Sequence, residues 1–357
     1  MKVKSKLVLA TALLATSIGE LTINDCVAQD IHFSQYQYSP LTLNPALAGM
    51  YNGDARILTN YKNQWSAIMS PYKTFAVSYD AAFMKQKWKK GFLGAGLSVF
   101  SDKAGDSEMS TTQIALSVSS NKALDAYNDI SVGLQAGFAQ SNVNSSQLFY
   151  GNQYNGSSFD PTISSEENLT ANKFTYGDFA AGLNWNYGKG TKYSTTNNQL
   201  KANAGFSVFH ANRPKQNFDN TINDRMNAKI SVYGNMLIGL NKDFAVLPSI
   251  IFLKQGATKE ISAGAMFRYL LKEESKYTNY IDGAAFSVGM YHRLGDAIII
   301  ASQLEVAHYA IGLSYDINTS GLTKASSGRG GFELSLRYVN PNPFNGRRTN
   351  SNTRFLN

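Results

Sequence analysis

Hydrophobic and polar residues alternate with a period of two through most of this chain. In residues 130–139 the even-numbered positions are apolar, whereas the odd-numbered ones are mostly glycine, serine or glutamine. Residues 178–187 and 308–317 repeat the pattern, with the apolar face ending in aromatic residues. Such alternation is typical of a β-strand with one apolar and one polar face. The whole chain predicts strands at residues 55–66, 72–83, 91–101, 108–120, 128–141, 174–187, 201–211, 226–240, 245–254, 259–271, 281–293, 296–304, 306–317 and 328–340.

The length of these strands favours a membrane protein. Strands of soluble proteins average about five or six residues, whereas a tilted strand that crosses a bilayer needs roughly nine to eleven. Small polar residues suit the inside of a barrel, and an aliphatic face with aromatic ends suits lipid. A soluble β-sandwich would have shorter strands and a more charged outer face. We therefore predict an all-β fold, a transmembrane antiparallel barrel of about fourteen strands.

The even strand number places both chain ends on one side of the membrane, which we expect to be the periplasm. The longest connection, residues 142–173, and a second sizeable one, residues 211–224, then lie outside, as long barrel loops usually do. The last strand ends at residue 340. We expect residues 341–357 to form a mobile periplasmic tail.

The N-terminus has the features of a secretory signal peptide. Three lysines precede an apolar run of about a dozen residues, and Cys26-Val27-Ala28 is a small-x-small cleavage site. The alternative, a lipid-anchored Cys26, is disfavoured because Ile23-Asn24-Asp25 precede it. The predicted domains are therefore a signal peptide (1–28), an N-terminal periplasmic or plug segment (29–54), the barrel (55–340) and the tail (341–357).

The segment in front of the first strand is irregular. Between residues 33 and 49 it contains Pro40 and Pro45, which would remove hydrogen-bond donors from a sheet. Asn44 is a good helix N-cap with Pro45 in the first helical position, and Gly49 can end the turn. We expect its aromatic and leucine side chains to pack in the lumen or at the periplasmic mouth of the barrel.

Residues for catalysis, cofactor binding or metal binding are not evident. The four histidines have no helical metal-site spacing, and the single cysteine lies in the signal peptide. We expect His308 to form hydrogen bonds inside the lumen and His210 and His292 to act as interfacial anchors. The net charge of +8 is spread along the chain, with its densest cluster at residues 85–90, and this does not fit nucleic-acid binding. We predict no enzyme, no cofactor and no metal.

Two stretches, DIHFSQYQYSPLTLNPALAG and YKNQWSAIMSPYKTFAVSYD, together resemble the opening of the PorP/SprF family of outer-membrane proteins. The family pattern is an Asp-Pro-x-Phe-Ser-Gln-Tyr start, Asn-Pro-Ala-x-Ala-Gly, Tyr-Arg-x-Gln-Trp and a Pro-x-x-Thr hairpin. The likeness continues at residues 205–218, 247–256 and 311–338. His32 and Lys62 depart from the family pattern. The matching positions are Phe33, Ser34, Gln35, Tyr36, Asn44, Pro45, Ala46, Ala48, Gly49, Tyr61, Gln64, Trp65, Pro71 and Thr74.

This resemblance implies a bacterial outer-membrane protein of type IX secretion that supports secretion or surface anchoring of partner proteins, such as large gliding-type adhesins. The implied partners are membrane lipids, periplasmic and outer-membrane secretion components, and in some members the C-terminal domain of an adhesin. The matching residues become candidates for partner binding or for plugging the lumen. The alternative function is a diffusion channel or a hydrophobic-solute transporter, which the small polar inner face would also suit.

Overall fold

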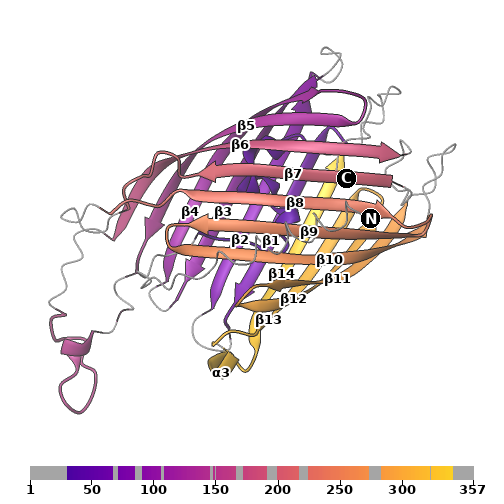
Figure 1. Cartoon of the computed structure of the whole chain (residues 1–357). Helices are drawn as coiled ribbons and strands as arrows, with labels where there is room; N and C mark the ends of the chain where they lie inside the picture. The colour runs from indigo at the N-terminus through magenta and orange to yellow at the C-terminus, as the bar shows by residue number, and fades with distance from the viewer. Residues whose placement is uncertain are drawn as a thin grey trace, which may run out of the picture.

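The chain forms one closed antiparallel β-barrel (Figure 1). The computed structural model describes residues 30–340 apart from 67–70, 85–90, 106–107, 145–147, 149, 166–171, 191–198, 217–223, 273–282 and 322. The wall consists of β1 Ala55–Gln64, β2 Tyr72–Phe83, β3 Gly91–Ala104, β4 Met109–Ala123, β5 Asn128–Asn142, β6 Lys173–Gly190, β7 Gln199–Phe209, β8 Lys229–Gly239, β9 Phe244–Gln255, β10 Thr258–Lys272, β11 Ala284–Arg293, β12 Ala297–Val306, β13 Tyr309–Asn318 and β14 Arg329–Asn340.

Each strand pairs with its neighbours in sequence, and β1 pairs with β14 to close the sheet. The closing register runs from Ala55 opposite Asn340 to Gln64 opposite Gly331. A closed sheet has no free edge, so every strand can satisfy its backbone groups inside a bilayer. The predicted fold class is confirmed, and the observed strand ends differ from the predicted ones by three residues at most.

The period-two pattern corresponds to the two faces of the wall. On β5, Val132, Leu134 and Phe138 are exposed on the outside, whereas Ser131 and Gln135 are buried inside. The same division holds on β6 and β13, so the apolar face is turned toward lipid and the polar face toward the lumen.

Pro248 lies inside β9, in the middle of the wall. It has a pairing partner on β10, Ala265, but the ladder between β8 and β9 lapses between Asn235–Ser249 and Ile238–Val246. A proline has no N–H to donate, so one side of the strand loses a bond there. A proline alone therefore does not exclude a segment from this wall.

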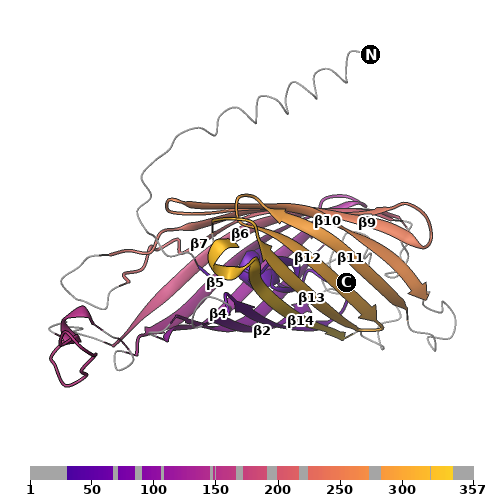
Figure 2. The same ribbon diagram turned by 90° about the horizontal axis from the view of Figure 1, so that it is seen from below.

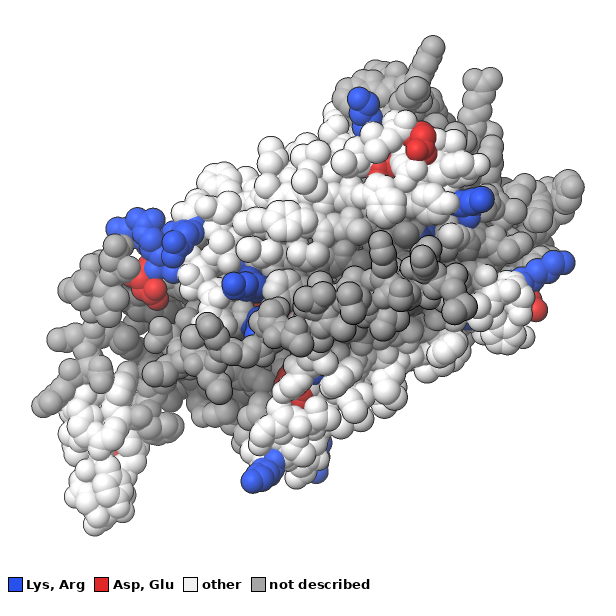
Figure 3. Space-filling view, viewed as in Figure 1, with Lys and Arg blue, Asp and Glu red and all other residues white. Residues whose placement is uncertain are grey.

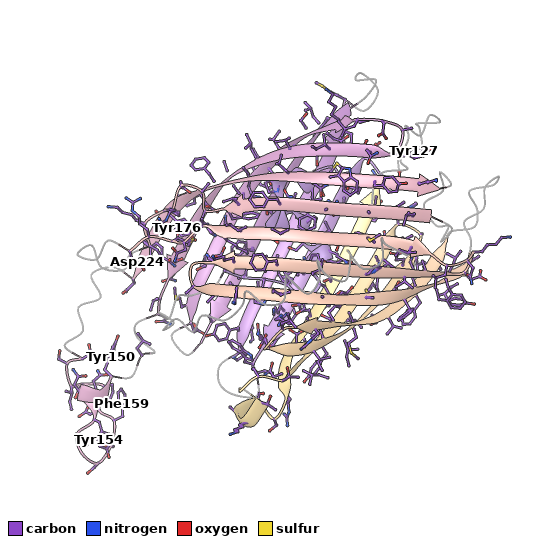
Figure 4. The ribbon with its side chains drawn as sticks, in the orientation of Figure 1. Tyr127, Tyr150, Tyr154, Phe159, Tyr176 and Asp224 are labelled. Carbon is purple, nitrogen blue, oxygen red and sulfur yellow. The ribbon has the colours of Figure 1, made fainter. Side chains whose placement is uncertain are left out.

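The two ends of the barrel differ. The connection between β5 and β6 contains the 3₁₀ turn η4 Gly151–Gln153 and projects away from the wall, and the connection between β13 and β14 contains α3 Thr323–Ser326 (Figure 1). Figure 4 shows Tyr150, Tyr154 and Phe159 in the projecting lobe and Tyr127 at the opposite end of the barrel. We call these the long-loop end and the short-turn end.

Outward aromatic rings mark the short-turn end. Trp185 and Tyr187 stack there beside Tyr127, and rings from neighbouring strands also meet in the pairs Phe244–Tyr269 and Tyr309–Tyr338. Amphipathic rings favour the boundary between the apolar core of a bilayer and its headgroups. These side chains form an aromatic girdle of the kind that membrane barrels have at the bilayer boundary.

The N-terminal segment lies inside the barrel (Figure 2). It contains η1 Tyr36–Tyr38, α2 Pro40–Leu43 and η2 Pro45–Leu47. As predicted, Asn44 caps the last turn, since its side chain accepts a hydrogen bond from the Ala46 N–H, and Gly49 follows with a φ of 71°. Of the two predicted places, the lumen and the periplasmic mouth, the segment occupies the lumen.

Several sequence predictions lie outside the described residues. They are the signal peptide, the C-terminal tail, and the basic cluster at residues 85–90. Among the described helices, none is long and apolar enough to cross a membrane.

Candidate functional site: the filled lumen

The N-terminal segment, residues 30–53, runs through the lumen from one end to the other. At the long-loop end the Asp30 N–H donates to the Gln255 side chain at the end of β9 (2.9 Å). At the short-turn end the Asp54 N–H, immediately after the segment, donates to the Asn340 carbonyl at the end of β14 (3.0 Å). We refer to residues 30–53 as the lumen segment.

Asn44 is the main polar contact in the middle of the lumen segment. It is fully buried, and its Nδ2 donates to the Leu183 carbonyl of β6 (2.8 Å), the Phe206 carbonyl of β7 (3.3 Å) and the Tyr233 hydroxyl of β8 (3.1 Å). Because its Oδ1 caps η2, one side chain both shapes the segment and attaches it to the wall.

Inward hydroxyl and amide side chains of the wall satisfy the carbonyl groups of the lumen segment. Because the segment is not part of any sheet, these carbonyls would otherwise be buried without partners. The donors come from strands on several sides of the barrel: Asn60 to Tyr38 O (2.8 Å), Ser119 to Ala48 O (2.7 Å), Ser131 to Ala46 O (3.0 Å), Gln135 to Leu41 O (3.1 Å) and Ser207 to Leu43 O (2.6 Å).

Inward glycines make room for the backbone of the segment. A Cβ atom on Gly182 would lie 1.9 Å from Asn44 Oδ1, and one on Gly133 would lie 2.2 Å from the Ala46 nitrogen. A Cβ on Gly94 would lie 2.1 Å from the Ala48 carbonyl oxygen. Real atoms cannot approach so closely, so the absence of side chains here shapes the wall to fit the segment.

A carboxylate on the closing strand receives the start of the lumen segment. Both Glu333 oxygens accept backbone hydrogen bonds, from the Ser34 N–H (2.7 Å) and the Gln35 N–H (3.0 Å). Lys62 Nζ lies 3.2 Å from the same carboxylate and donates to the His32 carbonyl (2.9 Å). The charge of Glu333 is thus balanced by a lysine while it orients the segment.

A second network of ionic groups lies beside it. Ser34 Oγ donates to Asp316 (2.8 Å), which also accepts from Arg293 Nη1 (3.0 Å). Arg293 Nε lies 3.3 Å from Glu260, and His32 Nε2 lies 3.3 Å from the other oxygen of that carboxylate. Oppositely charged groups from four elements therefore meet at the long-loop end of the lumen.

Arg56 and Asp80 hold the other end of the lumen segment. Both side chains are almost fully buried, and the guanidinium donates two hydrogen bonds to the carboxylate, at 3.0 and 2.8 Å. Asp80 also accepts from the Gly49 N–H (2.8 Å), and Arg56 lies 4.5 Å from the centre of the Tyr51 ring. This paired geometry satisfies charges that would be costly to bury singly.

The interpretation of His210 as an interfacial anchor is wrong. His210 is buried inside the barrel, directly after β7, where Nδ1 lies 2.9 Å from Asp178 and Nε2 contacts Asp30. Burial lowers the pKa of this imidazole, but the charges of Asp30 and Asp178 outweigh it and raise the pKa to about 9. A charged imidazole thus links Asp30 of the lumen segment to Asp178 of β6.

His308 does not lie on the inner face of a strand, as its sequence position suggested. It lies in the turn between β12 and β13 and is exposed, because β13 begins at Tyr309, three residues after the start of the predicted strand. His292, by contrast, is exposed near the end of β11, as expected for an interfacial residue. Within the described part of the chain, no cluster of His, Cys, Asp and Glu side chains could hold a metal ion.

The structure divides the family-motif residues into two groups. Phe33, Ser34, Gln35, Tyr36, Asn44, Pro45, Ala46 and Gly49 belong to the lumen segment. Gln64, Trp65, Pro71 and Thr74 lie at the long-loop ends of β1 and β2.

The second group has contacts of its own, separate from those of the lumen segment. The Trp65 and Tyr72 rings meet edge to face at 5.0 Å, and the backbone N–H of Trp65 donates to the Gly330 carbonyl. Thr74 donates to Asp102 at 2.5 Å. This group fixes the hairpin end next to the closing strand.

Sequence reasoning missed most wall partners of the lumen segment. These are inward charged or amide groups on strands: Arg56, Asp80, Asn235, Arg293, Asp316 and Glu333. A usable signal existed, because each of these residues lies on the inward face of a strand that the alternation predicts. Charged residues inside a membrane barrel are costly unless paired, so they mark functional contacts.

One family of membrane proteins matches this chain. The family model described as "Type IX secretion system membrane protein PorP/SprF" matches residues 26–338. No curated protein gives a significant match.

Solved structures with a similar fold include the Ralstonia pickettii toluene transporter TbuX, with 8% identity, 84% of this chain and 93% of that chain covered, and a TM-score of 0.45. The P. putida toluene transporter TodX has 13% identity, 83% and 92% coverage and a TM-score of 0.42. The KdgM porin has 7% identity, 80% and 98% coverage and a TM-score of 0.36. These values are too low to support any statement about substrates.

The family model matches most of the chain, and the chain forms a closed fourteen-strand barrel. The chain therefore belongs to the PorP/SprF family of type IX secretion system membrane proteins.

Proposed function

We propose that this barrel is located in the bacterial outer membrane and supports the secretion or surface anchoring of partner proteins, such as large gliding-type adhesins. Family membership is the observation that carries the proposal. The partners are periplasmic and outer-membrane components of type IX secretion, together with the C-terminal domain of an adhesin. In this role the protein binds other proteins and transforms no substrate.

We further propose that the lumen segment acts as a plug. Its buried contacts support this role, since Asn44, Asp80 and Glu333 each join the segment to the wall through several hydrogen bonds. Several buried hydrogen bonds that act together hold such a segment rigidly against the wall. Partner proteins can then be held by the segment and at the two mouths of the barrel.

The test of the secretion role is deletion of the gene, followed by quantitative proteomics of the cell surface and the culture medium. We expect at least one large surface protein to leave the surface and to return when the wild-type gene is restored. An unchanged surface and secretome in the deletion strain would contradict the proposal.

Single-channel recording on the purified barrel tests the plug and the alternative function together. A plugged subunit should give no steady conductance, and removal of residues 30–49 should produce open-channel steps. Steady conductance of the intact chain that a particular solute blocks would instead favour a diffusion channel or a hydrophobic-solute transporter.

A further inference from the structure

Two pairs of like charges lie opposite each other at the long-loop end of the barrel. Lys254 at the end of β9 is the direct cross-strand partner of Lys259 at the start of β10. In the neighbouring connection, Lys215 and Arg225 form an isolated antiparallel bridge. All four side chains are exposed. Like charges directly opposite each other destabilise a strand pair, so this arrangement favours a bound anion.

The Lys254–Lys259 pair continues the lipid-facing surface. On the same outward face of β9 lies Ile250, which is 51% exposed, and on that of β10 lies Phe267, which is 62% exposed. Ile230 of β8 is the cross-strand partner of Lys254 on its other side. The two lysines thus lie where the apolar band of the wall ends, which is the level of lipid headgroups in a membrane barrel.

The second pair lies close to the first. Asn227, two residues after Arg225, accepts a hydrogen bond on its carbonyl from the Gln255 side chain, and Gln255 directly follows Lys254. Figure 3 shows Lys and Arg side chains gathered at the end of the molecule where Asp224 lies in Figure 4, with an acidic group beside them. Arg213 is a further exposed basic residue in this connection.

Acidic residues offset this charge only in part. Asp224 lies in the same connection and already has an interaction, and Asp219 lies outside the described residues. Glu260, the next residue after Lys259, faces inward, toward Arg293 and His32. Within the part of the chain that the structure describes, no carboxylate pairs with Lys254 or Lys259.

We propose that Lys254 and Lys259, extended by Lys215 and Arg225, bind phosphate groups of lipid headgroups in the leaflet at the long-loop end. A phosphate between two ammonium groups accepts a charge-assisted hydrogen bond from each and removes their repulsion. Basic clusters beside an apolar membrane surface bind anionic lipid in this way. The pair thus fixes the depth and tilt of the barrel at one side of its circumference.

The test compares the variant Lys254→Gln/Lys259→Gln with the wild type in phosphatidylcholine vesicles with and without phosphatidylglycerol. The matched control is Lys122→Gln/Lys189→Gln, which removes two exposed lysines at the short-turn end. Phosphatidylglycerol should raise the thermal unfolding midpoint of the wild type and the control, and much less that of the variant. Native mass spectrometry should show roughly tenfold weaker retention of phosphatidylglycerol by the variant.

An equal effect of phosphatidylglycerol on variant and wild type would overturn the proposal. It would equally be overturned if inorganic phosphate, at matched ionic strength in phosphatidylcholine vesicles, reproduced the whole stabilisation, because the site would then bind a free anion and not a lipid headgroup. All variants carry exposed substitutions, and heat-shifted mobility on gels verifies that each barrel is folded.

Discussion

Single residues hold the lumen segment in place because the segment has no sheet of its own to satisfy its backbone. Asn44 contacts β6, β7 and β8 with one amide group, and the inward glycines let the backbone approach the wall. Burial without these bonds would cost about 1 to 3 kcal/mol for each unpaired group. The stability of the segment therefore depends on a few side chains whose removal has a measurable effect.

Replacement of Asn44 by alanine should lower the free energy of unfolding by about 2 to 5 kcal/mol, because the helix cap and several buried hydrogen bonds are lost together. Hydrogen exchange of the amides in residues 30–53 should speed up before that of the wall. The control is Asn241→Ala, whose side chain caps an exposed turn through Asp243 and Phe244, where water can replace it. Equal effects of the two substitutions would contradict this account.

The buried Arg56–Asp80 pair predicts a contrast with an exposed ion pair. Asp80→Asn leaves a buried guanidinium without its counter-charge and should destabilise the barrel by about 3 to 5 kcal/mol. Glu108→Gln breaks the exposed pair with Lys103 (2.7 Å) and should destabilise the barrel far less, because water screens that pair. Urea unfolding in detergent micelles measures both values, and a small cost for Asp80→Asn would show that the pair is dispensable.

At the scale of elements, the wall was predictable because its pattern is local. An outward apolar residue at every second position specifies a strand and its face without knowledge of its neighbours. The lumen segment was predictable only in part: its Asn44 cap follows from adjacent residues, whereas the bond from Ser34 to Glu333 joins residues far apart in the sequence. β13 begins later in the sequence than predicted, which places His308 in a turn. The tight connection between β12 and β13 sets this boundary, and the alternation does not show it.

A substitution on the inner face of β6 tests the fit between wall and segment. Gly182→Val should displace Asn44, since even a Cβ atom would lie 1.9 Å from its oxygen. We expect a lower thermal midpoint and the appearance of conductance steps. Gly177→Val, in the same strand but with only the Gly137 carbonyl oxygen near its Cβ, at 4.0 Å, is the matched control and should change neither property. An unchanged thermal midpoint and no conductance steps in both variants would mean that the segment does not depend on this glycine.

The contacts of His210 predict a pH dependence at the long-loop end. Asp30 of the segment and Asp178 of β6 contact its ring, and Lys229 of β8 lies 3.8 Å from Asp30. Because the pKa is raised from its ordinary value of 6.5 to about 9, the stabilisation is complete below about pH 6.5 and is lost as pH rises through about 9.

A nitroxide label on Ile31→Cys reports this change as mobility in electron paramagnetic resonance. The mobility of the label should increase between about pH 8 and about pH 10. His210→Asn, which tolerates the positive φ of 54° at this position, should abolish the transition. The same transition in that variant would assign the titration to another group.

At the scale of the whole molecule, the barrel combines an ordinary membrane wall with a lumen that its own N-terminal segment occupies. Neither feature alone points to secretion. Family membership and the plug together make a partner-binding subunit the more consistent proposal.

The most direct test is affinity purification of the tagged barrel from its native cells in mild detergent, with quantitative mass spectrometry against an unrelated outer-membrane barrel of similar abundance. The account predicts specific enrichment of type IX secretion components together with a large surface protein. Recovery of the barrel without such partners, combined with solute-specific conductance of the intact chain, would contradict it.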